Sequence, residues 1–275
     1  PFYMFTQSLG PFEHDFPFRS LANFLLGRYL RYPERIFARE REGYESVRRF
    51  TDDNVILTAD LVLQNRDYRL ENIYHEPPAL REIAVEPGAV GIVPNIWVDK
   101  LMGKGALVRL YVRIVRMLAE NRKPVYILKH ADEDSDLCRG IVEACSGCGV
   151  RIIDGDFSVI ELERIISRFD FIVTSRYHSL VNAYKNGVPA VVIGWATRYR
   201  ELMENMGQSA YHFDCRDGID QAALEKAVKI MLGQFPDEKQ VIGRRLEAIS
   251  YTDPCSVFMP AVSMTEPVVQ ENCVG

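Results

Sequence analysis

The stretch Asp170–Gly207, with the sequence DFIVTSRYHSLVNAYKNGVPAVVIGWATRYRELMENMG, decides the fold. It contains two short, uninterrupted apolar runs, each followed by a segment with helical periodicity. Strands are expected at 170–174 and 188–193, and helices at 177–186 and 198–206. Between them, Gly187 fits a helix C-terminus and Pro189 the start of a strand. Apolar strands without polar alternation are typical of parallel sheets covered on both faces, so the stretch predicts part of a doubly wound sheet.

The same alternation continues on both sides of this stretch. Upstream, we expect strands at 89–93, 125–129 and 150–153, with helices at 105–121, 134–146 and 158–168. Downstream, we expect helices at 220–233 and 237–249, and then a tail from 252 without periodicity. An earlier block has expected strands at 2–8, 35–39 and 55–59, with helices at 18–31 and 40–50.

A polar, proline-containing segment, 64–88, separates the two blocks and is interpreted as a long excursion or linker. We therefore predict an α/β protein with two doubly wound, Rossmann-like domains, of which the N-terminal one is incomplete. The predicted division is a partial N-terminal domain with linker at 1–86, a C-terminal domain at 87–235, and a helix and tail at 236–275. We expect the tail to be disordered or strapped to the surface.

The overall composition narrows the function classes. The 275 residues are 47% hydrophobic, which is enough for a sizeable core, and the net charge of −5 argues against a broad nucleic-acid surface. No apolar run of about 18 residues and no signal-peptide pattern occurs, so we expect no membrane span and a cytoplasmic location. Cys145 and Cys148 form a CxxC at a helix end without a second ligand pair nearby, so no metal site is predicted.

The segment Thr174–Ser179 is the sharpest functional signal, because parallel sheets bind ligands beyond the carboxyl ends of their strands. A helix N-terminus favours anions, and Arg176 adds a planar fork suited to carboxylate or phosphate. His178 can transfer protons near neutral pH. The alternative interpretation is that Thr174 or Ser175 merely caps the helix and Arg176 is a surface charge.

Other polar residues follow the remaining strands. Arg198 lies beyond the strand 188–193 and is either a second cationic clamp or a solvated charge. Arg39 follows the strand 35–39 and is either a cleft residue or an ordinary surface arginine. His130 opens an acidic run to Asp136, which we interpret as a solvated helix entry. Predicted substrate-binding residues are Arg39, Ser175, Tyr177, Ser179, Arg198, His130, Ser8 and Gly10, with Arg176 and His178 as catalytic candidates.

In the stretch Asp170–Gly207, the order of strand, Arg-x-His, helix and Gly-Val-Pro resembles the polysaccharide pyruvyl transferase family. Other segments agree in order with this family: the Gly10-Pro11-Phe12 turn, Arg39-Glu40 with Ser46, Asp60 after a strand, and His130 with Asp136. The family usually has lysine where this chain has Arg198, and lysine is a point charge rather than a fork. The family also carries a further stretch before the Gly-Pro-Phe turn, so we expect the start of the N-terminal domain to be missing.

The resemblance implies a GT-B-like fold with its active site between two domains. It implies pyruvyl transfer from phosphoenolpyruvate to a sugar of a cell-surface polysaccharide precursor, forming a ketal without metal or organic cofactor. His178 would be the acid/base, and the acceptor would be a free sugar or a lipid-linked oligosaccharide that brings the enzyme to the inner face of the membrane. Two alternatives stay open: a GT-B glycosyltransferase that uses a nucleotide sugar, and a truncated, non-catalytic relative that acts as a binding subunit.

Overall fold

The N-terminal unit is a small parallel sheet with two helices. The computed structural model describes residues 1–12, 19–64, 68–249 and 254. The unit contains β1 (Tyr3–Gln7), α1 (Arg19–Leu30), β2 (Arg35–Ala38), α2 (Arg41–Arg48) and β3 (Val55–Leu57). The three strands pair in the order β1-β2-β3, and all pairs are parallel. Its apolar core is small and is formed by Leu30, Ile36, Ala38, Val47 and Val55.

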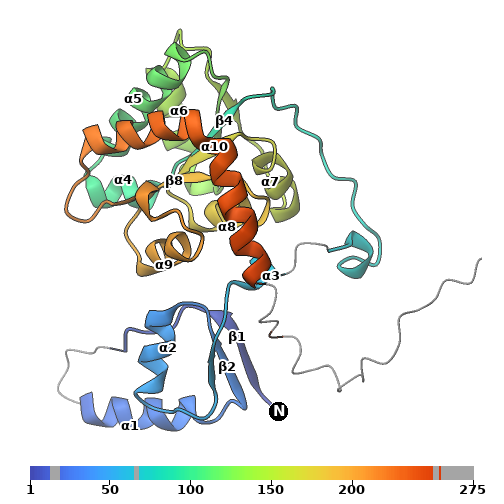
Figure 1. The fold of residues 1–275 in the computed structure, drawn as a ribbon, viewed down its shortest axis with the longest axis vertical. Helices are drawn as coiled ribbons and strands as arrows, with labels where there is room; N and C mark the ends of the chain where they lie inside the picture. The colour runs from blue at the N-terminus through green and yellow to red at the C-terminus, as the bar shows by residue number, and fades with distance from the viewer. Residues whose placement is uncertain (13–18, 65–67, 250–253, 255–275) are drawn as a thin grey trace, which may run out of the picture.

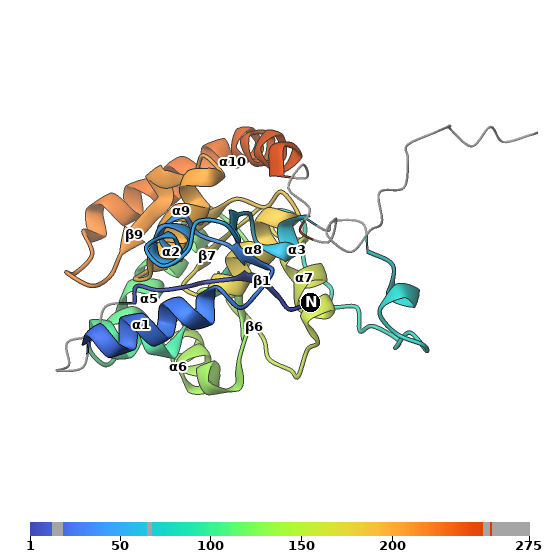
Figure 2. The ribbon, with the colours of Figure 1, turned by 90° about the horizontal axis from the view of Figure 1, so that it is seen from below.

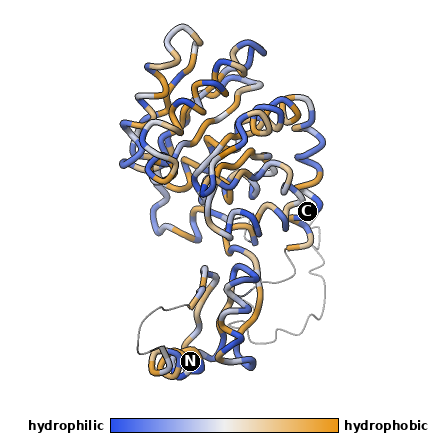
Figure 3. Tube along the Cα trace, turned by 90° about the vertical axis from the view of Figure 1, so that its left-hand side faces the viewer, coloured by the Kyte–Doolittle hydropathy of each residue, from blue (hydrophilic) through white to orange (hydrophobic). Residues whose placement is uncertain are grey.

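The C-terminal unit holds a parallel six-stranded sheet. Its first half contains β4 (Val90–Val93), α4 (Ile96–Met102), α5 (Ala106–Glu120), β5 (Val125–Leu128), η2 (Asp132–Asp134), α6 (Ser135–Ala144) and β6 (Arg151–Ile153). Its second half contains α7 (Val159–Ile166), β7 (Phe171–Thr174), α8 (Tyr177–Lys185), β8 (Ala190–Gly194), α9 (Thr197–Asn205), η3 (Ser209–Tyr211), β9 (His212–Asp214) and α10 (Gln221–Ile249). Figures 1 and 3 show the two units as separate lobes, with the C-terminal unit the larger.

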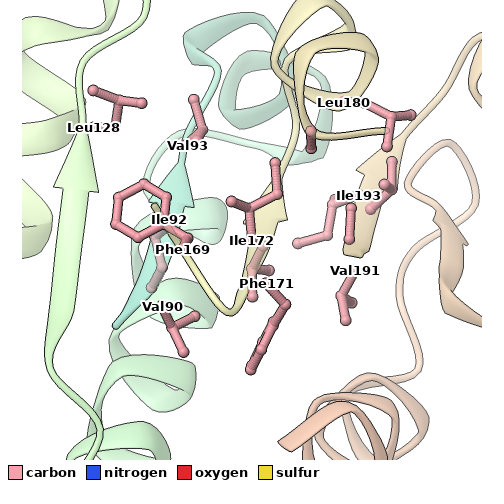
Figure 4. Close-up of a cluster of buried hydrophobic side chains, with 14 of the residues drawn as sticks. Val90, Ile92, Val93, Leu128, Phe169, Phe171, Ile172, Leu180, Val191 and Ile193 are labelled. Carbon is pink, nitrogen blue, oxygen red and sulfur yellow. The ribbon is translucent and has the colours of Figure 1, made fainter. Parts of the chain in front are cut away.

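The strand order β6-β5-β4-β7-β8-β9 is that of a doubly wound sheet whose two halves run outward from β4 and β7. The strands are apolar on both faces because helices cover both faces, and Figure 4 shows their side chains packed on either side of the sheet. Gly91 lets β4 approach the buried Phe169, since a Cβ there would lie 2.6 Å from two ring carbons.

The end of α8 follows the sequence prediction. Gly187 has φ = 66°, donates its N–H to the Tyr184 carbonyl, and is followed by a bond from the Val188 N–H to the Ala183 carbonyl. This is a Schellman ending, in which a left-handed residue lets the last carbonyls find donors. It turns the chain back into β8 and so fixes where the next carboxyl end lies.

Segment 64–88 connects the two units, and its described residues, 64 and 68–88, have little regular structure. It contains the end of α3 (Leu61–Gln64) and η1 (Leu70–Asn72), and it runs along one side of the molecule in Figure 1. Arg81 ties it to α7 through an ion pair with Glu161, at 2.9 Å from Nε to Oε1. The described part of the segment agrees with the interpretation as a long excursion or linker.

Three features differ from the sequence predictions. The short elements α3, α4 and β9 were not predicted, because each is too brief to show periodicity. The two helices expected at 220–233 and 237–249 are one helix, α10, with Pro236 inside it. Buried side chains on both sides of the proline, including Met231 and Ile242, hold the helix together, and it changes direction part-way along in Figure 1. The predicted tail from 252 lies outside the described residues except for 254.

The units meet at a seam formed by the turn after β1 and helix α2 on one side, and by α8 and α9 on the other. Figures 1 and 2 both show α2 beside α9. Within the part of the chain that the structure describes, no helix is long and apolar enough to cross a membrane. The same residues hold no cluster of three or more His, Cys, Asp or Glu side chains suited to a metal ion.

Candidate active site

The candidate site lies at the carboxyl edge of the C-terminal sheet. There the neighbouring parallel strands β4 and β7 end, and the chain leaves them toward opposite halves of the sheet. The loops after these two strands are joined, because the Asn95 side chain donates to the Ser175 carbonyl at 3.1 Å. Asn95 also accepts from the Trp97 N–H at 3.0 Å and thereby caps α4. These hydrogen bonds hold together the loops after β4 and β7, and the site residues extend from these loops.

Thr174 and Ser175 are the structural part of the predicted segment. The Thr174 hydroxyl accepts from the Arg176 N–H at 3.0 Å, which closes a turn just before α8; Thr174 does not cap the helix, because Arg176 is the N-cap residue. The Ser175 hydroxyl lies 3.0 Å from the Tyr111 hydroxyl, and both side chains are buried. Ser179 is also fully buried, and its hydroxyl has no partner among the described residues. Both side chains lie in the interior, which does not favour the prediction that Ser175 and Ser179 bind substrate.

Arg176 is neither a surface charge nor a free clamp. Its Nε and Nη2 bind Asp134 at 2.8 and 2.6 Å, and Nη2 also binds Glu133 at 3.0 Å. Asp134 is fully buried and accepts from the Ile96 N–H at 2.9 Å. Burial raises the pKa of Asp134 even though Arg176 opposes this shift. Two of the three guanidinium nitrogens of Arg176 already bind carboxylates, so its charge is largely balanced and the structure does not favour the predicted anion clamp.

Asp134 also corrects the interpretation of the acidic run after His130. That run was predicted to be solvated, and Asp132 and Asp136 are indeed exposed. Asp134 is instead the N-cap residue of α6, directed inward to Arg176. A four-residue acidic run gives no sign of which member turns inward, because this depends on the position of the β7–α8 loop.

Arg39 is likewise paired, on the N-terminal side of the seam. Its Nε binds Glu40 at 2.7 Å, its Nη1 binds Asp60 at 2.9 Å, and its Nη2 binds the Ser8 hydroxyl at 2.5 Å. Its side chain is 12% exposed, which rules out the surface alternative. All three guanidinium nitrogens are engaged, so Arg39 is part of the seam, and the structure does not favour the prediction that it binds substrate.

Arg39 and Arg198 both lie against Tyr177, in an arrangement we call the Tyr177 stack. The guanidinium carbons are 4.7 Å (Arg39) and 4.9 Å (Arg198) from the centre of the Tyr177 ring. The ring is buried, and Tyr199 contacts it edge-on at 5.4 Å. Cation–π attraction of this kind brings two like charges close to one ring. Tyr177, predicted to bind substrate, instead supports two cations.

Arg198 differs from the other two arginines. None of the ion pairs found within the described ranges involves it, and its Nε is buried without a hydrogen-bond partner. A buried, unpaired guanidinium nitrogen is costly unless a ligand satisfies it. The residue as a whole is only partly buried, so Arg198 is the predicted clamp whose guanidinium has no carboxylate partner among the described residues.

His178 and His130 are brought near each other and near Arg176. His178 is exposed, and partial burial together with Arg39, Arg198 and Arg176 lowers its pKa, although Asp60 acts in the opposite direction. Burial, followed by Arg176 and His178, lowers the pKa of His130 to about 4. Both imidazoles are therefore neutral at pH 7, and each can accept a proton. His130 lines a separate cavity of about 210 Å³.

A cavity of about 400 Å³ opens at the seam beside the Tyr177 stack. It is lined by Ser8, Leu9, Gly10, Pro11, Glu40, Glu42, Gly43, Trp195, Ala196, Thr197, Arg198 and Arg216. Gly10 has φ = 72°, and a Cβ there would lie 2.7 Å from Ser46 of α2, so only glycine fits. The predicted residues Ser8, Gly10 and Arg198 thus share one cavity.

Helix α9 begins at the wall of this cavity, and α8 begins beside it at Tyr177, which Arg198 contacts. The N-cap residues of α8 and α9, Arg176 and Ala196, make no side-chain capping bond. Free N–H groups and the helix dipole at such ends favour anions. With Arg198 at the start of α9 and His178 at the start of α8, the arrangement can bind a small anion and move a proton beside it.

The sequence pattern of the family described as polysaccharide pyruvyl transferase matches residues 1–197. This range is more than half of the 275 residues. The chain belongs to the polysaccharide pyruvyl transferase family. Within this pyruvyl transferase family member, the match contains His130, Arg176, Tyr177 and His178, and it ends one residue before Arg198. A search of curated proteins found no match.

Solved structures show that this pyruvyl transferase family chain has the predicted GT-B-like fold. A Methanocaldococcus jannaschii UDP-GlcNAc 2-epimerase in complex with UDP-GlcNAc and UDP has a TM-score of 0.52 at 14% identity, covering 85% of this chain and 64% of that chain. MnaA of S. aureus, solved with UDP, has a TM-score of 0.54 at 14% identity, covering 86% and 60%. S. aureus TarM has a TM-score of 0.51 at 9% identity, covering 93% and 48%. The chain spans less than two thirds of the length of each of these proteins.

Proposed function

We propose that the chain transfers the pyruvyl group of phosphoenolpyruvate to two hydroxyls of a sugar, forming a pyruvate ketal and releasing phosphate. Family membership supports a polysaccharide pyruvyl transferase activity. The observation that carries the choice of an anionic donor is Arg198, a partly buried cation that has no carboxylate partner in the described ranges and lies beside two uncapped helix N-termini. Phosphoenolpyruvate carries a phosphate and a carboxylate, which such a site can bind together.

The proposed reaction adds one sugar hydroxyl across the double bond of phosphoenolpyruvate. Neutral His178 accepts the hydroxyl proton and returns it to the methylene carbon, while the sugar oxygen bonds to the adjacent carbon. A second hydroxyl then displaces phosphate from that carbon, and its proton leaves with the phosphate. The lowered pKa of His178 favours the neutral form that begins this transfer. No metal or organic cofactor takes part in the proposed reaction.

The proposed acceptor is a sugar of a cell-surface polysaccharide precursor, such as an exopolysaccharide repeat. It is either free or linked to a lipid. The proposed reaction takes place in the cytoplasm, and a lipid-linked acceptor would bring it to the inner face of the membrane. Nucleic acid has no part in this proposal.

Calorimetry with phosphoenolpyruvate tests the proposal, with UDP titrated separately. We expect wild type to bind phosphoenolpyruvate and Arg198→Ala to bind it roughly 10- to 100-fold more weakly, because a charge-assisted hydrogen bond contributes about 1.5–3 kcal/mol. The control is Arg200→Ala, because Arg200 lies on the same helix, is exposed and pairs with Glu204. Its affinity should equal that of wild type.

Turnover is tested separately, by phosphate release from phosphoenolpyruvate with a panel of free sugars and sugar nucleotides. His178→Ala should keep the affinity of wild type and lose roughly 10²–10⁴-fold in rate. Tight UDP binding without phosphoenolpyruvate binding would instead favour a nucleotide-sugar glycosyltransferase, the alternative suggested by the UDP complexes of similar fold. A folded chain that binds neither ligand would favour a non-catalytic subunit.

A further inference from the structure

Glu201 makes a contact across the seam that the proposed mechanism does not use. Its carboxylate accepts from the backbone N–H of Arg41 at 2.5 Å and from that of Glu42 at 3.0 Å. These are the first two residues of α2, in the N-terminal unit, whereas Glu201 belongs to α9 in the C-terminal unit. The N-cap residue of α2, Glu40, makes no side-chain capping bond itself. A carboxylate from the other unit therefore caps this helix.

On both sides of this contact, residues close by in the chain belong to the Tyr177 stack. Arg39 immediately precedes the N-cap of α2, and Arg198 lies three residues before Glu201 on the same face region of α9. Arg39 and Arg198 each lie within 5 Å of the centre of the Tyr177 ring. The Glu201 contact and the Tyr177 stack thus join the same two segments of chain at neighbouring points.

The positive charges of Arg39 and Arg198 repel each other at the Tyr177 ring. A further interaction between the two units is therefore needed to keep both arginines there. The small cavity between Arg39, Tyr177 and Arg198 is also lined by Glu201. The carboxylate satisfies two helix N–H groups at once. Among the described residues of α9, only Glu201 has a carboxylate that accepts bonds from the backbone of α2.

We propose that Glu201 is a positioning residue, which caps α2 across the seam and thereby sets the place of Arg39 relative to Arg198 at Tyr177. This inference rests on the proposed function, because it assigns to Glu201 the arrangement in which Arg198 binds phosphoenolpyruvate. Glu201 itself touches no substrate. Removing its charge lowers the fraction of molecules with the binding arrangement, and the measured affinity falls by the same factor.

The test compares Glu201→Gln with Glu204→Gln in the full chain. Glu204 lies on the same helix, is about half exposed and pairs only loosely with Arg200, at 3.8 Å. We expect Glu201→Gln to weaken phosphoenolpyruvate binding about 5-fold, which is the effect of losing a typical helix cap, with no such change for Glu204→Gln. Glu201→Asp keeps the charge and should recover part of the affinity, which a change in packing alone would not produce.

Hydrogen exchange at the amides of Arg41 and Glu42 gives a second measurement, which needs no ligand. Faster exchange in Glu201→Gln, with wild-type exchange in Glu204→Gln, is the expected result. Unchanged exchange in Glu201→Gln would overturn the inference, and so would wild-type affinity despite faster exchange. If wild type binds no phosphoenolpyruvate, the proposed function fails, and the exchange measurement alone then decides whether Glu201 holds the seam.

Discussion

Substitution of Arg176 by alanine is predicted to lower the stability of the fold, whereas the same substitution of Arg198 is predicted to leave stability nearly unchanged. Arg176→Ala leaves Asp134 fully buried with its charge unpaired, although the Ile96 N–H still donates to it. Breaking a buried ion pair in this way costs about 3–5 kcal/mol. We expect a loss of about 3 kcal/mol in the free energy of unfolding, because Asp134 keeps its backbone donor.

Arg198→Ala removes a cation that no carboxylate in the described ranges balances. It loses two contacts to aromatic rings, at 4.9 and 5.8 Å, each contributing about 0.5–1 kcal/mol. It also removes a buried nitrogen without a hydrogen-bond partner, which offsets about 1–3 kcal/mol. We therefore expect a change within about 1 kcal/mol of wild type, together with the loss of donor binding described above.

Urea unfolding followed by circular dichroism and tryptophan fluorescence measures both variants at pH 7 and pH 5. In Arg176→Ala, the pKa of Asp134, already raised by burial, rises further once the arginine is gone. The folded state then binds a proton more readily than the unfolded chain, so the loss of stability shrinks as the pH falls. Arg198→Ala should show no such pH dependence relative to wild type.

The double variant Arg176→Met/Asp134→Asn provides the control for this reasoning. Its amide oxygen still accepts from the Ile96 N–H, and neither partner carries a charge. Replacing a buried ion pair by neutral groups is often close to neutral, so most of the loss should be recovered. The reasoning is refuted if Arg176→Ala loses less than about 1 kcal/mol, if Arg198→Ala loses as much as Arg176→Ala, or if the double variant recovers nothing.

Three further predictions concern pH and packing. The pKa of His130 is about 4 in the folded chain, against 6.5 ordinarily. The neutral imidazole therefore contributes up to roughly 3 kcal/mol of stability, which is present above pH 6.5 and lost as the pH falls through 4. In urea unfolding, His130→Gln should reduce the fall of the midpoint with decreasing pH. Because the pKa of His178 is lowered, kcat/KM should fall with decreasing pH only below pH 6.5. A fall of kcat/KM that begins above pH 6.5 would contradict His178 as the base. Gly91→Ala should lose about 1–3 kcal/mol of stability, because the added Cβ would overlap the Phe169 ring. Gly140→Ala is the control, since a Cβ there would have no atom within 4 Å, and it should lose no stability. Thermal unfolding measures both variants.

The sequence predicted the strands and helices around Thr174–Ser179 well because each strand is covered on both faces. An apolar run such as Phe171–Thr174 has no polar alternation, and it ends where the helix begins at Tyr177. Pro236 misled the prediction because its local effect is strong. The burial of Met231 and Ile242 on the two sides of it depends on contacts that no window of sequence contains.

From the sequence alone, Arg176 and Arg198 were expected after neighbouring strands of the C-terminal sheet, and Arg39 after a strand of the N-terminal sheet. Only the tertiary structure decided which of them is free. Asp134 and Glu133 meet Arg176, and Glu40 and Asp60 meet Arg39, whereas no carboxylate in the described residues meets Arg198. The physical reason is that the order of residues fixes where a strand ends, whereas an ion pair depends on the distance between loops far apart in the chain, and Coulomb attraction falls with that distance.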